Sequence, residues 1–188
     1  EIQMAVAASR LAMKDARLSP ENYDSTRVGV SLGTGIINND LDEIGVGFRK
    51  GLDEQGKFSM PKFGQDGICA LFPLWFLKYL PNMPACHISV ANHLRGPNNT
   101  ITTSSAASTQ AIGEAYRVIE RGDADIMLAG GTDSKLNAMG VSRFQLLGLL
   151  STRDESPEKV YCPFDKKHDG IVLGEGSGIL ALECLDSA

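Results

Sequence analysis

Hydrophobic positions along the chain follow two periods, one typical of helices and one typical of strands. Ile2, Val6 and Met13 lie at helical spacing in an Ala-rich stretch, whereas Val28, Val30 and Leu32 alternate with small residues. The same reading predicts helices at 2–18, 39–50, 105–121 and 136–149, and a mostly helical stretch at 70–93 interrupted near Pro81 and Pro84. It predicts strands at 28–32, 100–103, 125–129, 170–174 and 177–183.

Strands that alternate with helices indicate βαβ units and a parallel or mixed sheet with helices on its faces. The strand at 125–129 is short and apolar after Asp125, as buried parallel strands are, and Gly130-Gly131 is expected to close it. With 188 residues and no linker, repeat or low-complexity segment, the chain reads as one domain.

Charge and composition narrow the classes of partner. The net charge is −5 and no basic stripe is present, which argues against nucleic acid or an anionic membrane. An acidic carrier protein as partner requires a local cluster of Lys and Arg, which net charge does not reveal. The longest apolar run, 70–77, is too short to span a bilayer. Four cysteines without a CxxC pair fit reduced thiols in a cytoplasmic protein.

Glycine-rich turns and histidines do not form a cofactor motif. Gly33-Thr34-Gly35 begins like a dinucleotide fingerprint but lacks its third glycine, and the glycines at 174–178 lack the Lys of a phosphate loop. Tight turns and close approach of the backbone explain these glycines better. The three histidines lack the spacing of metal ligands. We therefore expect neither a metal nor a cofactor.

Ser105 is the main candidate for chemistry. It lies in the small-residue run 101–108, where the chain turns from a strand into a long helix. An oxygen on the first turn of a helix lies in the field of the backbone N–H groups, which stabilises developing negative charge. A serine hydroxyl also needs a general base to become a nucleophile. The alternative is that Ser105 only caps the helix, a position at which Ser is favoured.

Several short motifs resemble one family when they are taken in order. They are Leu94-Arg95-Gly96-Pro97-Asn98, Ala111-Ile112-Gly113-Glu114-Ala115, Gly122-Asp123-Ala124-Asp125, Ala129-Gly130-Gly131-Thr132-Asp133, Leu150-Ser151-Thr152-Arg153, Pro163-Phe164-Asp165, Asp169-Gly170 and Gly174-Glu175-Gly176. The ordered set resembles the β-ketoacyl-ACP synthases of the elongating type, the condensing enzymes of fatty-acid and polyketide synthesis.

This resemblance implies the α/β fold called thiolase-like, which has two similar halves. Residues 1–188 then correspond to a truncated N-terminal half, with the first strand and the whole C-terminal half absent. A mixed five-stranded sheet with helices on both faces is expected for this half. The family supplies two catalytic histidines from its second half, so we expect this fragment to be inactive by itself.

The resemblance also places the nucleophile. In the family a cysteine in a Thr-x-Cys-x-Ser-like run accepts the acyl group, and alignment on Ile112-Gly113 puts Ser105 at that cysteine, two residues after Thr103. The implied partners are acyl carrier protein, acyl and malonyl thioesters, and a second subunit in a homodimer or a ketosynthase heterodimer. An alternative is a non-catalytic subunit like the chain-length factors, which pair with an active ketosynthase.

Three further residues fall where the family lines its acyl pocket. They are Ile36, Trp75 and Phe144. Each is equally compatible with a simple core position, because large apolar side chains are common in both. Gly148 stands where the family commonly has an arginine before the Leu-Ser motif.

Overall fold

The computed structural model describes residues 1–37 and 39–185. The chain divides into two compact units. The first contains Glu1–Ile37, Leu77–Ser134 and the C-terminal residues from Glu175, and the second contains 39–76 and Lys135–Gly174. No helix formed by the described residues is both long and apolar enough to cross a membrane.

The first unit is built on a mixed sheet of four strands in the order β2-β1-β3-β4. The strands are β1 (Val28–Thr34), β2 (Asn98–Ile101), β3 (Ile126–Ser134) and β4 (Glu175–Glu183). Both β2 and β3 run parallel to β1, whereas β4 is antiparallel to β3. The expected mixed sheet is confirmed.

The expected fifth strand, at 170–174, is wrong for the described residues. Ile171 forms only an isolated bridge with Leu150. The reason is that β4 pairs with β3 along its whole length, from Ile126 opposite Glu183 to Ser134 opposite Glu175. Since β3 ends at Ser134, residues before Glu175 have no strand to pair with. The pairing also carries β3 beyond Gly130-Gly131, where it was expected to end.

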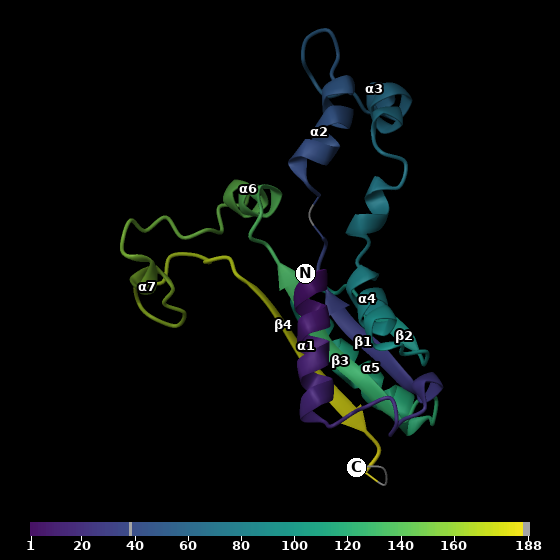
Figure 1. The fold of residues 1–188 in the computed structure, drawn as a ribbon. Coiled ribbons are helices and arrows are strands. Elements are labelled where there is room, and N and C mark those ends of the chain that lie inside the picture. Colours follow the sequence, from purple (N-terminus) through teal and green to yellow (C-terminus); the bar gives the residue numbers. More distant parts are fainter. Residues whose placement is uncertain (38, 186–188) are drawn as a thin grey trace. The chain divides into compact units, whose positions relative to one another are not determined.

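Helices cover both faces of this sheet, as predicted (Figure 1). On one face lie α1 (Ile2–Asp15), which packs on β3 and β4, and α4 (Met83–Asn92), which packs on β1 and β2. On the other face lies α5 (Ala107–Glu120), against β1 and β3. Pro84 lies in the first turn of α4 and does not interrupt a helix, because the first turn needs no N–H from that residue.

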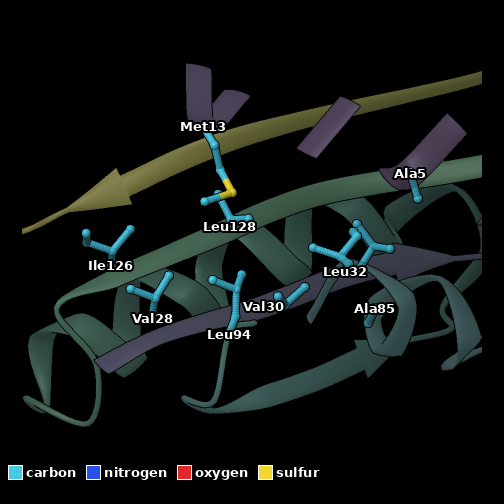
Figure 2. Packing of buried hydrophobic residues seen from close by; sticks show 10 residues of the cluster. Ala5, Met13, Val28, Val30, Leu32, Ala85, Leu94, Ile126 and Leu128 are labelled. Carbon is cyan, nitrogen blue, oxygen red and sulfur yellow. The ribbon is translucent and has the colours of Figure 1, made fainter. Parts of the chain in front are cut away.

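The alternation in β1 divides the core between the two faces. Val28, Val30 and Leu32 are fully buried toward α1 and α4, where they join Met13 and Leu128 (Figure 2). On the opposite face, Ala115 and Val118 of α5 join Met127 and Ala129 of β3 and the preceding Ala124 in a second cluster. Small residues on this face allow the α5 backbone to approach the sheet closely.

The second unit contains α2 (Leu41–Lys50), α3 (Met60–Lys62), α6 (Ala138–Leu146) and α7 (Pro157–Val160). Gly148 follows α6 with a φ of 65°, a left-handed conformation that glycine adopts without strain. Its N–H donates to Gln145 O, and the N–H of Leu149 donates to Phe144 O, which is the usual pairing at a glycine-terminated helix. This conformation explains why a glycine occupies position 148.

Candidate functional site

The N-terminal end of α5 lies directly on the sheet at two glycines. A Cβ at Gly33 of β1 would overlap the backbone between Ala107 and Ser108, and a Cβ at Gly131 of β3 would lie 2.6 Å from Ser108 Cβ. Any side chain at either glycine would push the helix outward. The predicted close backbone approach is thereby confirmed for Gly33. It is wrong for Gly174, Gly176 and Gly178, where no described atom lies within 4 Å of an added Cβ.

That turn connects β2 to α5 and carries Ser105. Ser104–Ala106 form a 3₁₀ turn that runs into α5, and Ser104 has a φ of 56°. A positive φ is uncommon for residues other than glycine and indicates local strain that the surrounding structure must hold. A short side-chain hydrogen bond from Thr103 Oγ1 to Gln110 Oε1 ties the start of the turn to the second turn of α5.

Ser105 is exposed and is not a helix cap. The residue that caps the 3₁₀ turn is Thr103 and the residue that caps α5 is Ala106, and neither makes a side-chain capping hydrogen bond. The alternative reading of Ser105 as an N-cap is therefore wrong. Within the described chain its hydroxyl has no hydrogen-bond partner, so it faces solvent at the start of the helix.

A cavity of about 590 Å³ opens beside Ser105. It is bounded by the carboxyl ends of β1 and β3, the first turns of α5 and the amino half of β4, and includes Gly33, Ser108, Gly131 and Ser177. The lining is made mostly of glycines and hydroxyl side chains, with Ile112, Ile179 and Leu180 as its apolar part. Such a volume accommodates a small organic ligand.

Few charged side chains line this cavity. Asp133 is the one ionisable residue that lines it among the described residues, and its Oδ1 accepts the backbone N–H of Ser134 at 2.9 Å. In the second unit, hydrogen bonds from Ser151 and Thr152 lower the pKa of the Asp169 carboxyl. Without a neighbouring imidazole or amine, the field of the α5 N-terminus is the main electrostatic feature near Ser105.

The three acyl-pocket candidates fall in both units. Ile36 is exposed and lies one residue beyond Gly35, which lines the cavity. Trp75 and Phe144 are half-buried in the second unit. Their grouping around an acyl chain stays a prediction. Within the described chain no group of three or more His, Cys, Asp or Glu side chains could hold a metal ion.

Sequence reasoning missed two residues of this site. Ser108 fits between two glycines, and Gln110 holds Thr103. Small residues at 33, 108 and 131 could have indicated the first contact. No sequence signal marked Gln110, because its partner is seven positions away and the intervening turn is irregular.

Comparison with known proteins gives a consistent result. The model of the family described as "Beta-ketoacyl synthase, N-terminal domain" matches residues 1–188. The chain is 36% identical to 3-oxoacyl-[acyl-carrier-protein] synthase 2 of Staphylococcus aureus (strain N315) over 186 residues, which are 99% of this chain and 41% of that protein. The synthase 2 of Vibrio cholerae is also 36% identical, over 97% of this chain and 41% of that protein. The chain thus spans about two fifths of the length of these curated relatives.

Solved structures give the same picture. A ketosynthase of a type II polyketide synthase, solved with its acyl-carrier protein and bound to the hexaketide, matches with a TM-score of 0.80 and 29% identity. The match covers 99% of this chain and 44% of that one. The ishigamide ketosynthase/chain length factor matches with a TM-score of 0.70 and 30% identity, over 99% and 41%. The expected thiolase-like fold is therefore confirmed for the part of it that this chain spans.

Proposed function

Because the chain belongs to the β-ketoacyl synthase family, we propose that the whole protein is a 3-oxoacyl-[acyl-carrier-protein] synthase-like acyltransferase of fatty-acid or polyketide synthesis. One observation carries this proposal. Ser105, which we assign to the position of the family's nucleophilic cysteine, is exposed at the N-terminal end of α5 beside a cavity of about 590 Å³.

The chemistry follows from that position. The Ser105 oxygen attacks the thioester carbonyl of an acyl carrier protein, the C–S bond breaks, and the carrier leaves as its thiol with the serine proton. Decarboxylation of malonyl carrier then gives a carbanion that attacks the new ester, releasing the serine and forming a 3-oxoacyl product. The helix terminus stabilises the anion of the addition step.

Activation of the hydroxyl requires a general base from outside the described residues. A thiolate is abundant near neutral pH when its pKa is lowered, whereas a serine must lose its proton as it attacks. The cavity offers no imidazole. We therefore assign the base to the remainder of the protein and expect residues 1–188 alone to be inactive.

A second candidate is a non-catalytic partner subunit like a chain-length factor. The similar ishigamide structure contains a ketosynthase with a chain length factor, which supports this alternative. In this role the cavity shapes the acyl chain of an active partner, and Ser105 forms no covalent bond.

Mass spectrometry of the full-length protein separates the two candidates. The protein is incubated with an acyl-carrier thioester and digested, and the peptide containing Ser105 is examined for the acyl mass, with Ser105→Ala as the blank. An adduct that the blank lacks supports the acyltransferase. An unmodified peptide, together with stable pairing to a Cys-containing ketosynthase, supports the partner subunit.

The proposal includes the setting in which the protein works. Acyl carrier protein is the proposed partner, acyl and malonyl thioesters are the proposed substrates, and the native state is a homodimer or a ketosynthase heterodimer. Residues 1–188 are taken as part of an N-terminal domain, which the 41% share of the relatives supports. All four cysteines are free, which fits a reducing cytoplasm.

A further inference from the structure

A second cavity, of about 510 Å³, lies in the segment between α2 and Cys69. It belongs to the second unit, whereas the cavity beside Ser105 belongs to the first. Its lining is basic, since Arg49 and Lys50 are the last residues of α2 and Lys62 is the last residue of α3. Asp66 supplies the one carboxylate of the lining, so three positive side chains face one negative one.

The three cations of this cavity are not neutralised within the described chain. Neither Arg49, Lys50 nor Lys62 takes part in an ion pair there. Asp53, the nearest carboxylate after α2, instead accepts the backbone N–H groups of Gln55 and Lys57. In a chain with a net charge of −5, this is a local excess of positive charge, which attracts anions.

The scaffold beneath the cations is held by aromatic packing. The rings of Phe48, Phe58 and Phe63 lie with their centroids 5.2–5.5 Å apart. Such pairs contribute stabilisation beyond burial alone. Because Phe48 precedes Arg49 and Phe63 follows Lys62, this packing fixes the end of α2 relative to α3.

A backbone hydrogen bond reinforces the same arrangement. The N–H of Ser59 donates to Gly51 O at 2.9 Å, which returns the chain from the end of α2 to the start of α3. Lys62 is half-buried, so the base of its side chain is restricted. Cations that are already placed cost less ordering when an anion binds.

We propose that this cavity binds a phosphate ester. A guanidinium presents forked donors to phosphate oxygens, and an ammonium adds a compact positive charge. The excess of two positive charges in the lining matches a phosphate dianion better than a single carboxylate. Gln65 offers a neutral donor and Leu52 an apolar edge for the organic part of the ligand. The site is separate from the Ser105 cavity, so its test does not depend on the function proposed above.

Cys69 provides a local readout, because its exposed side chain lines this cavity. In the full-length protein, the rate of alkylation of Cys69 by neutral iodoacetamide is measured by mass spectrometry with and without glycerol 3-phosphate or inorganic pyrophosphate. We expect saturating probe to slow Cys69 by about threefold or more, since a ligand bound in this cavity covers the thiol that lines it. Cys184, exposed in the first unit, is the internal control and keeps its rate.

Charge variants identify the binding groups. Arg49→Gln combined with Lys62→Gln is expected to abolish the protection, whereas Lys57→Gln, in the same segment but outside the lining, keeps it. A phosphoserine peptide distinguishes the source: protection by the peptide alone assigns a phosphate carried by a protein, and protection by glycerol 3-phosphate assigns a free small molecule.

Three results overturn the proposal. They are no protection by any phosphate probe, equal protection by sodium chloride at matched ionic strength, and protection that survives in the double variant. Protection by an acidic protein that carries no phosphate, in the absence of any effect of phosphate itself, also overturns it.

Discussion

The guanidinium of Arg27 donates two hydrogen bonds to the carboxylate of Asp125. Nη2 lies 2.6 Å from Oδ1, and Nε lies 3.2 Å from Oδ2. Arg27 immediately precedes β1 and Asp125 immediately precedes β3, so the pair joins the amino ends of the two central strands. The same guanidinium donates to the carbonyl oxygens of Gly122 and Asp123, just after α5. One side chain therefore connects both strands to the C-terminal end of α5, whose N-terminal end follows the turn that carries Ser105.

This pair predicts an acid-dependent contribution to stability. The hydrogen bond from Arg27 holds the pKa of the Asp125 carboxyl below its ordinary value of 3.8. A carboxyl whose pKa is lowered on folding stabilises the fold above its unfolded-state pKa, and that stabilisation is lost as the pH falls through the folded-state pKa. We expect a modest effect, because both side chains are partly exposed.

The check is urea unfolding of the wild type, Arg27→Gln and Asp125→Asn at neutral pH and at about pH 3, below the ordinary carboxyl pKa. Both variants should be less stable than the wild type at neutral pH and closer to it in acid. Arg117→Gln, which removes an exposed pair with Glu120, serves as control. A gap between wild type and variants that widens in acid contradicts the assignment.

A side chain added at Gly131 should lower the free energy of unfolding, because it separates α5 from the sheet. Gly131→Ala places a Cβ 2.6 Å from Ser108 Cβ and should destabilise the protein by about 1–3 kcal/mol through overpacking. The control is Gly113→Ala within α5, where nothing in the described chain lies within 4 Å of the added Cβ. The control should stabilise by about 0.5–1 kcal/mol, because Ala favours the helix. Chemical denaturation measures both; equal effects would refute the close-approach argument.

Ser105→Cys predicts a gain of acyl transfer. A thiolate at a helix N-terminus is favoured by the local field and is the better nucleophile, so we expect the full-length variant to form the acyl adduct at least about tenfold faster than the wild type. Ser104→Cys is the control one residue away, at the position with positive φ. Adduct formation is followed by intact mass. An equal rate at both positions would mean that exposure alone, and not the site of Ser105, determines reactivity.

We expect two copies of the protein to dimerise through the outer edge of β2. β2 is the edge strand beside β1, and the N–H of Thr100 donates to Asn99 Oδ1. If two copies pair along this edge, Thr100→Pro places a proline in the pairing strand and should weaken dimerisation by about tenfold or more, since prolines disrupt edge pairing. Analytical ultracentrifugation of the full-length protein measures this, with thermal unfolding to confirm that the fold persists. An unchanged dimer affinity would place the interface elsewhere.

The elements with a clear period could be predicted from the sequence. The alternation Val28, Val30 and Leu32 predicted β1, and α5 ends at Glu120, one residue before its predicted end at 121. The strand count was wrong because residues 170–174 carry an apolar run that suits a strand, and only the length of β3 shows that they have no partner. Strand pairing depends on neighbours far along the chain, which local patterns do not contain.

The candidate site, too, could be predicted from the sequence only in part. The ordered motifs identified the family, which the family model confirms, whereas the assignment of Ser105 to the nucleophile position stays a prediction. They did not show that Ser105 fails to cap the helix, since the cap depends on where the 3₁₀ turn ends. The basic cavity could not be predicted from the sequence either. Arg49 and Lys62 are 13 positions apart, and only the fold of the segment between them brings both into the lining.

The sequence by itself determined the family and the alternating strands and helices, because each is a matter of residue type and local spacing. Tertiary structure decided the four-stranded pairing, the contact of Ser108 with Gly33 and Gly131, the cavity beside Ser105 and the gathering of unpaired cations around Cys69. These features arise where separate segments pack together, and burial and charge at such contacts are properties of the folded chain.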